Sequence, residues 1–360
     1  MDAVRLGLDA LVVAAAYHSV RAFAPRLPSR RVVTVDAGAY FEPDPRLYGE
    51  IQPLKAAGPV SGDSLRRCVE LAAEAGIRLR AWAVLTHSTS LGRRHADHTV
   101  ENAFGDRYLH ALCPSSPAVR AYAAGLVADI AERGMTSIDL EAFGSYGYAH
   151  GSHHDKPRHD LSPAAEALLS LCFCRWCTAA FGSADIDAER LRSATVKAAD
   201  ASVQEPDLGK GPLEALGALP DGERAVEMRA QATLELLAEV RAAVGIAVEL
   251  HAIGTAAPLG LGDPMAAGDP RLRAHVDGVI VPAYGLAPEA VVGEIEAARA
   301  AIGVPVAVGL RIVAPDGGGT RLEHCVRAAT DAGVASFRHY HFGLATAAEL
   351  EALGHVVRNG

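Results

Sequence analysis

The sequence predicts an α/β fold, a (β/α)8 TIM barrel in one domain covering residues 1–360, with a helical insertion between strands 4 and 5. Apolar, β-branched runs of strand length alternate with amphipathic runs of helix length, which is typical of a parallel sheet covered by helices. Eight such units in 360 residues fit a closed ring of strands. An open, doubly wound sheet is the alternative, but the first strand is followed by no Gly-rich phosphate loop.

The elements follow in order from composition and periodicity. Eight apolar segments are predicted as strands: Leu11–Tyr17, Arg31–Asp36, Arg78–Leu85, Ser137–Glu141, Ala247–Ile253, Gly278–Ala283, Pro305–Arg311 and Ala335–His341. Segments of helical periodicity lie between most of them: Ser64–Ala75, Ser116–Arg133, Pro288–Ile302, Arg321–Ala332 and Ala347–Val357. Ser64 and Ser116 are suited to cap helices, and glycines such as Gly76 and Gly134 are suited to end them.

Two connections depart from this repeating pattern. The segment His18–Arg30 is short and contains Pro25 and Pro28, so a helix there is disfavoured. The connection at residues 142–245 is long, and we expect it to form a helical insertion or lid over the barrel. Its predicted helices are Pro163–Phe181, Ala188–Val203 and Glu223–Val244, with a Gly- and Pro-rich loop at Glu205–Gly222.

Composition and charge exclude several classes of partner. The chain is 50% hydrophobic and 21% charged, with a formal net charge of −9. That charge argues against nucleic acid and against an anionic membrane surface, and no apolar run approaches the ~20 residues of a membrane helix. The N-terminal apolar run Leu11–Ala16 follows Asp9 and continues into Tyr17, so we interpret it as a strand rather than a signal peptide. A cytoplasmic location with six reduced cysteines is therefore expected.

The predicted strand Ser137–Glu141 carries two carboxylates, Asp139 and Glu141. Residues two apart on a strand face the same way and lie roughly 6.5–7 Å apart. Like charges this close tend to separate their pKa values, so that one carboxyl keeps a proton near neutrality. Acid/base chemistry on a sugar-like bond uses such a pair. Acids that only cap a helix or pair with an arginine are the alternative.

Polar and aromatic residues mark the predicted carboxyl ends of nearly all the strands, where (β/α)8 barrels build their chemistry. A pocket for a hydroxylated ligand uses carboxylates and imidazoles for hydroxyl groups and aromatic rings for sugar faces. The residues expected to bind substrate are His18, Asp36, Tyr40, His87, His150, Glu249, His251, Tyr284, Arg311, His339 and His341. Ordinary loop polarity is the alternative for any one of them.

On the last predicted strand only one set of side chains can face the lumen. Arg338 and Tyr340 share one face, and His339 and His341 share the other. We expect the histidines to face the lumen, because the apolar Phe337 lies on their face.

A histidine-rich loop, His150–Asp155, and a cysteine cluster follow the fourth strand. The histidines are expected to line the pocket mouth. A structural zinc site needs four ligands, which Cys172, Cys174 and Cys177 together with the nearby histidines could supply; zinc knuckles, however, usually show two paired motifs, and only one pair is present. Buried cysteines also serve as small apolar residues. The sequence therefore predicts no cofactor, with a divalent metal as the alternative.

The ending Asp139-Leu-Glu141 resembles the fourth strand of chitinase-like and hexosaminidase-like glycosidases. In those families the Glu is the general acid and the Asp orients a substrate group, which implies these roles for Glu141 and Asp139. The predicted seventh strand, Pro305–Arg311, lacks the second Glu of the common retaining pattern.

The chain also resembles a group of uncharacterised bacterial glycoside-hydrolase-like TIM-barrel proteins. The stretches that carry this resemblance are Tyr17–Ser19, Tyr40–Pro43, Thr86–Thr89, Asn102–Asp106, Leu112–Pro114, Asp139–Glu141, His150–His154 and Leu169–Cys174. The resemblance implies the barrel fold and, more distantly, glycosidase activity.

These observations predict a glycosidase-type hydrolase that acts on a carbohydrate or a glycosylated small molecule, with Glu141 as general acid/base and Asp139 as its electrostatic partner. One alternative is a metal-dependent sugar isomerase or lyase, with Glu141, Glu249, His251 and His339 as ligands. A non-catalytic sugar-binding barrel, or a barrel recruited to natural-product biosynthesis, is another.

Overall fold

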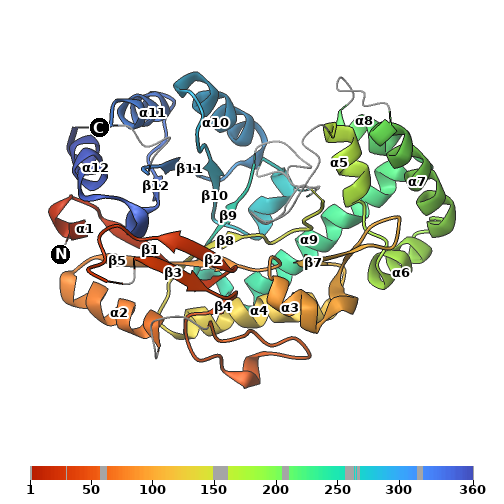
Figure 1. The fold of residues 1–360 in the computed structure, drawn as a ribbon, viewed down its shortest axis with the longest axis horizontal. Coiled ribbons are helices and arrows are strands. Elements are labelled where there is room, and N and C mark those ends of the chain that lie inside the picture. Colours follow the sequence, from red (N-terminus) through yellow and green to blue (C-terminus); the bar gives the residue numbers. More distant parts are fainter. Residues whose placement is uncertain are drawn as a thin grey trace.

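The computed structural model shows an α/β protein built on one curled, mostly parallel sheet (Figure 1). It describes residues 2–29, 31–56, 63–148, 161–204, 211–255, 263, 265, 268–313 and 319–359. The strand order in the sheet is β12-β11-β10-β9-β8-β5-β1-β4. The parallel strands are β1 Ala10–Tyr17, β5 Arg78–Val84, β8 Ser137–Glu141, β9 Glu249–Ile253, β10 Gly278–Pro282, β11 Val306–Arg311 and β12 Phe337–Tyr340. The remaining strand, β4 at Gly38–Ala39, runs antiparallel to β1.

The predicted second barrel strand, Arg31–Asp36, is wrong. Its core forms β3 (Val32–Val35), which pairs antiparallel with β2 (Val20–Phe23) in a separate hairpin. A parallel neighbour needs a crossover of about a dozen residues or more, usually a helix. The segment between β1 and β3 is short and contains prolines, so the chain folds back on itself and β1 pairs directly with β5.

The sheet curls strongly, although strand pairing does not close it into a ring among the described residues: β12 pairs only with β11, and β4 ends the other edge. Side chains nevertheless meet across its interior. Arg338 on β12 reaches Asp139 on β8, and Tyr340 on β12 contacts Trp82 on β5. The described residues thus form a curled sheet whose interior is crossed by side-chain contacts, and the predicted closure into a barrel is not seen among their strand pairings.

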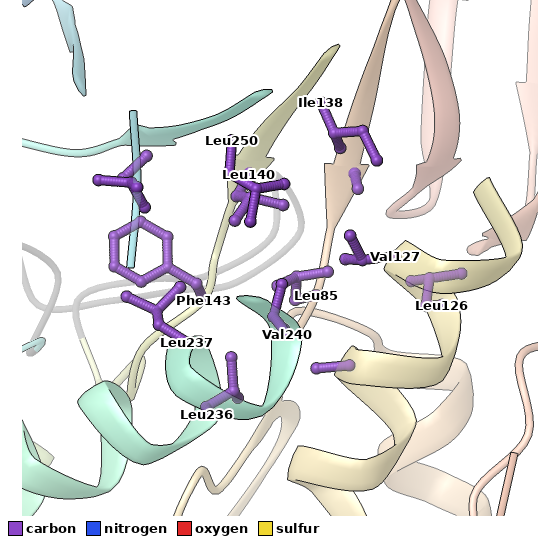
Figure 2. Packing of buried hydrophobic residues seen from close by; sticks show 14 of the residues in the cluster. Leu85, Leu126, Val127, Ile138, Leu140, Phe143, Leu236, Leu237, Val240 and Leu250 are labelled. Atoms are coloured by element: carbon purple, nitrogen blue, oxygen red, sulfur yellow. The ribbon is translucent and has the colours of Figure 1, made fainter. Parts of the chain in front are cut away.

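Helices cover the outer face of the sheet. They are α2 Ser64–Ala75, α4 Pro117–Glu132, the C-terminal half of α9 Gly222–Val244, α10 Pro288–Ile302, α11 Gly319–Asp331 and α12 Ala347–Asn359. Ile138 and Leu140 of β8 point outward into this layer, where they belong to one core with Leu126 of α4 and Leu237 of α9 (Figure 2). Because alternate residues of a strand face opposite ways, Asp139 and Glu141 face the interior.

The remaining secondary structure is short or lies apart from the sheet. The short helices are α1 Asp2–Arg5, α3 Thr89–Arg94 and the single turns η1 Pro45–Leu47, η2 Ala96–His98, η3 Gly245–Ala247, η5 Pro270–Ala274 and η6 Phe342–Leu344. A second hairpin pairs β6 (Thr99–Glu101) with β7 (Arg107–Leu112). The sequence analysis predicted neither this hairpin nor α3.

A helical lobe, which we define as α5 to α8, lies at the end of α9 away from the sheet (Figure 1). Its helices are α5 Pro163–Ser170, α6 Arg175–Ser183, α7 Ala188–Gln204 and α8 Pro212–Gly217. The single helix predicted at Pro163–Phe181 is thus two helices bent by 87°. Among the described residues no single helix is long and apolar enough to cross a membrane, and only the bent pair α5 and α6 meets that composition when taken together.

Gly125 in the middle of α4 lets this helix approach the η1 turn closely, since a Cβ atom there would collide with the Leu47 carbonyl oxygen. We expect Gly125→Ala to destabilise the protein by about 1–3 kcal/mol, because backbone must move to make room. Gly293 in α10 is the matched control, since nothing lies within 4 Å of its added Cβ. Gly293→Ala should stabilise by up to about 1 kcal/mol through helix propensity. Urea unfolding of both variants measures the difference, and equal effects would contradict the packing account.

Candidate active site

Asp139 lies in the middle of β8 and is held by two arginines inside the curled sheet. Nε of Arg338 donates to its Oδ2 atom over 2.8 Å, and Nη2 of Arg80 on β5 lies 3.4 Å from its Oδ1 atom. The Asp139 side chain is only 2% exposed. A buried carboxylate needs such partners, because burying an unpaired charge is costly. Of the two alternatives stated from the sequence, Asp139 therefore follows the second, in which the carboxylate pairs with arginine.

Two residues of β9, His251 and Glu249, lie beside Arg80, and together with Asp139 and Arg338 they form what we call the charged layer. Nη2 of Arg80 donates to Nδ1 of His251 over 2.7 Å, while Nη1 lies 3.6 Å from Oε2 of Glu249. Burial lowers the pKa of His251, and the charges of Arg80 and Arg338 add to this effect against the opposing charge of Asp139. A neutral imidazole accepts the hydrogen bond from Arg80 without adding a further charge to the layer.

Glu141 ends β8 in a different environment, among tyrosines near the carboxyl ends of the strands. Three tyrosine hydroxyl groups lie near it, those of Tyr17 on β1, Tyr284 after β10 and Tyr146 after β8. Burial is the main cause that raises the pKa of all three, and the charge of Glu141 raises it further. Its Oε2 atom is buried and has no hydrogen-bond partner in the part of the chain that the structure describes. The carboxyl thus lies among buried aromatic side chains, an apolar enclosure that we call the aromatic layer.

The aromatic rings of this enclosure contact one another, two pairs edge to face and one pair tilted. The ring centroids of Tyr17 and Trp82 lie 5.1 Å apart at 73°, and those of Trp82 and Tyr340 lie 5.7 Å apart at 74°. Tyr284 lies 5.3 Å from Tyr340, and the Arg311 guanidinium stands 5.4 Å from the Tyr284 ring centroid. Of these residues the sequence analysis selected only Tyr284 and Arg311, which both lie in this layer.

Burial raises the pKa of Glu141 to about 7. The nearby Trp82 indole lowers it in part, although the indole N–H makes no hydrogen bond of full geometry. Repulsion from Asp139, the cause expected from the sequence, is therefore wrong as the reason for the raised pKa of Glu141. Asp139 is not among the groups that shift Glu141, because two guanidinium groups already balance its charge. The two carboxylates differ because one is ion-paired and the other is surrounded by aromatic rings.

A cluster of imidazoles and tyrosine lies beyond this layer. His18 stacks on Tyr17 at 4.1 Å, and its ring centroid lies 5.3 Å from that of His87. His87 in turn lies 5.8 Å from His110 and 6.0 Å from Tyr146. The predicted site residues His18 and His87 are therefore brought together. The sequence analysis missed His110, because it lies on β7 of the unpredicted hairpin.

Asp263 is a second buried carboxyl near the carboxyl end of β8, where a Cβ atom on Gly144 would collide with it. Burial raises the pKa of Asp263 to about 7, against the opposing effects of a hydrogen bond from the Met265 backbone N–H and of the Arg229 charge. Its charge also acts on Tyr146. No strand pattern marks this residue, so sequence reasoning could not select it.

A cavity of about 1510 Å³ runs through the curled sheet, from Thr136 near the amino ends of the strands to Tyr284 near their carboxyl ends. Asp139 and Tyr40 line it, and burial raises the pKa of Tyr40. Glu141 is not among its described lining residues, whereas Tyr17, Trp82 and Tyr284 beside Glu141 do line the cavity, and Glu141 itself is partly exposed.

The expected orientation of the last strand is wrong. Arg338 and Tyr340 face the interior, where they contact Asp139 and Trp82. His339 faces the outer side, stacked on Phe337 at 6.0 Å, because Phe337 packs into the outer core. Burial lowers the pKa of His339 to about 4.

The other predicted site residues are dispersed. Asp36 is exposed in the turn after β3, outside the curled sheet. His341 directly follows β12, its ring lies 4.8 Å from the Tyr340 ring, and it lines the same cavity as Asp139 and Tyr284. His150 lies outside the described residues.

The fold does not bring together the four residues that would bind the metal in the isomerase alternative. Glu249 and His251 belong to the charged layer with Arg80, Glu141 lies in the aromatic layer, and His339 faces outward. Among the described residues, the ligand atoms of these four do not converge on one point.

The pKa of Glu141 predicts a pH-dependent cost to stability. Because the folded pKa of about 7 exceeds the ordinary 4.5, the fold loses stability as the pH rises from about 4.5 to 7. The full cost is about 3 kcal/mol above this range. We expect Glu141→Gln to have a higher Tm than the wild type at about pH 8, and a similar Tm at about pH 4.5. Thermal unfolding at both pH values tests this, and a pH-independent difference would contradict burial as the cause.

We compared the chain with protein families, with curated proteins and with solved structures, and only the solved structures gave matches. No family model matches the chain, and no curated protein matches its sequence. The α-L-fucosidase isoenzyme 2 from Paenibacillus thiaminolyticus is 12% identical with a TM-score of 0.56, and the match covers 99% of this chain but 44% of the fucosidase. The chain thus spans less than half the length of that enzyme.

Two further solved structures are more distant. The chitinase RmChi1 from Rhizomucor miehei is 11% identical with a TM-score of 0.44, covering 85% of this chain and 89% of the chitinase. The endo-β-1,4-mannanase from Thermotoga petrophila is 13% identical with a TM-score of 0.33, covering 81% of this chain and 72% of the mannanase. The likeness to the fucosidase shows the fold alone, over the part of that enzyme that this chain spans.

Proposed function

We propose that the protein is a glycoside hydrolase in which Glu141 is the general acid/base. The observation that carries the proposal is the Glu141 carboxyl itself. It ends an interior strand, burial raises its pKa to about 7, and its Oε2 atom has no hydrogen-bond partner among the described residues. A carboxylic acid with a pKa near the working pH is protonated often enough to donate and basic enough to take the proton back.

The surroundings suit a sugar. Tyrosine and indole rings line the same layer and offer flat apolar faces, while His18 and His87 nearby offer hydrogen bonds to hydroxyl groups. In the reaction, Glu141 would protonate the glycosidic oxygen, which leaves with the bonding electron pair as an alcohol while the anomeric carbon becomes an oxocarbenium ion; water would then bond to that carbon and give its proton back to the Glu141 carboxylate. The fold shared with a fucosidase supports this reaction class.

Asp139 has a different role in this proposal from the one expected from the sequence. Its ion pairs with Arg80 and Arg338 occupy the oxygen atoms that would otherwise orient a substrate group. We assign it the role of a positioning residue, which holds β5, β8 and β12 around the aromatic layer through charge pairing.

A panel of aryl glycosides that differ in the sugar tests the reaction class. The expected result is hydrolysis of at least one sugar by the wild type, with kcat/KM falling above about pH 7 as the acid loses its proton. Saturable binding of a sugar to the wild-type protein with no turnover of any glycoside would instead favour a non-catalytic sugar-binding barrel.

A further inference from the structure

Where the helical lobe meets the end of β7, the sulfur atoms of four cysteines converge on one point. These residues are all buried, and their Sγ atoms lie within 4.8 Å of one another: Cys113, Cys172, Cys174 and Cys177. The Sγ atom of Cys113 lies 3.6 Å from that of Cys177 and 4.0 Å from that of Cys172. Four sulfurs bound to one zinc ion at 2.3 Å in a tetrahedron lie about 3.8 Å apart, so the spacing fits this geometry.

The ligands come from separate parts of the chain. Cys113 directly follows β7 of the second hairpin, whereas Cys172 and Cys174 occupy the sharp bend between α5 and α6, and Cys177 lies in the first turn of α6. The bend is what brings these three thiols to one side. From the sequence, these three thiols were grouped with the nearby histidines, because Cys113 is far away along the chain.

Hydrogen bonds to the sulfurs add to the convergence. The backbone N–H of Cys174 lies 3.5 Å from Sγ of Cys172, and the hydroxyl of Ser115 lies 3.3 Å from Sγ of Cys177. Donors directed at sulfur stabilise thiolates, and partners of this kind orient metal ligands.

A buried cation lies near the cluster. Arg229 of α9 is 1% exposed, and its Nε and Nη2 atoms have no hydrogen-bond partner within the described ranges. Its charge acts on Cys172 as well as on Asp263. A zinc ion with four thiolates has a net negative charge, which would balance an arginine that is otherwise costly to bury.

We propose that Cys113, Cys172, Cys174 and Cys177 form a structural zinc site. Four protein ligands leave no open position, so the site would have a structural rather than a catalytic role. It would fasten the β6–β7 hairpin to the bend between α5 and α6. Tyr108 and His110 lie on that hairpin, so the zinc would also hold one side of the imidazole cluster in place.

Metal analysis of the full-length protein, purified without chelators from zinc-supplemented culture, tests the proposal. We expect one zinc ion per chain, and X-ray absorption with four sulfur ligands at about 2.3 Å. Cys113→Ser should reduce the bound zinc, whereas the control Cys68→Ser, outside the cluster, should keep it. Since Cys113→Ser could fail to fold, the absorption spectrum of the wild type is the deciding measurement.

A second measurement uses stability. Removing the metal from the wild type with a strong chelator should lower Tm, and adding zinc back should restore it, because a ligand bound only to the folded state stabilises that state. A protein without metal after anaerobic reconstitution with zinc chloride would overturn the proposal. So would stoichiometric iron in place of zinc, or a disulfide between any two of the four cysteines.

Discussion

Glu141→Gln is expected to lower kcat/KM by about 10²–10⁴-fold on glycosides whose leaving group needs a proton. The amide keeps the size and the buried position of the side chain but cannot donate a proton to the glycosidic oxygen. In the wild type the rate should fall above about pH 7, because burial raises the pKa of Glu141 to about 7 and the acid form is lost there. The variant should lose this limb of the pH profile. Steady-state kinetics across the pH range provide the measurement.

The leaving group separates catalysis from a structural effect. A dinitrophenyl glycoside departs without a proton, so its hydrolysis should suffer far less in Glu141→Gln than that of an alkyl glycoside. Glu296→Gln, on the exposed side of α10, is the control and should behave as wild type. Equal losses on both substrates would point to misfolding, and a wild-type rate on the alkyl glycoside would end the assignment of Glu141.

The second large effect is expected at Arg338. Its Nε atom donates to Asp139 over 2.8 Å, and the Asp139 side chain is almost fully buried. Arg338→Met leaves that carboxylate with Arg80 at 3.4 Å as its nearest guanidinium. Removing one partner of a buried ion pair costs about 3–5 kcal/mol, because the remaining charge stays in a poorly solvated place. Denaturant unfolding of the variant and the wild type measures the cost.

A double-mutant cycle gives the matched test. In the Arg338→Met background, Asp139→Asn should cost far less than it does in the wild type, because the unpaired charge is then removed. Arg327→Met breaks only an exposed pair with Glu323 on α11 and should cost below about 1 kcal/mol. Additive effects of Asp139→Asn and Arg338→Met would show that their ion pair contributes no coupling.

Much of the outer architecture could be predicted from periodicity. The strand Ser137–Glu141 and the helices Ser64–Ala75 and Pro288–Ile302 have the predicted bounds. Their apolar residues are buried in a pattern that local spacing already encodes. Arg31–Asp36 was misplaced because strand propensity does not say which partner a strand pairs with, and the short proline-containing connection decided that.

The interior was harder to predict than the fold. The rule that sites form at strand ends selected Glu141, His18, His87 and Tyr284. It left out Arg80 and Trp82, which stand within a strand, and the expected strand orientation placed Arg338 away from the lumen. The alternation Arg78-Leu-Arg80-Ala-Trp82 did carry a signal, since polar residues at every second position of a buried strand must face something polar or aromatic. Asp263 and Cys113 carried no such signal.

The sequence by itself determined that strands and helices alternate, and that Asp139 and Glu141 face the same side of one strand, because both depend on neighbouring residues alone. Tertiary structure decided that one acid meets two guanidinium groups and the other meets aromatic rings. It also decided that a distant cysteine joins three adjacent ones. These outcomes depend on which strands and loops approach each other, and such contacts between residues far apart in the chain follow from packing the whole molecule.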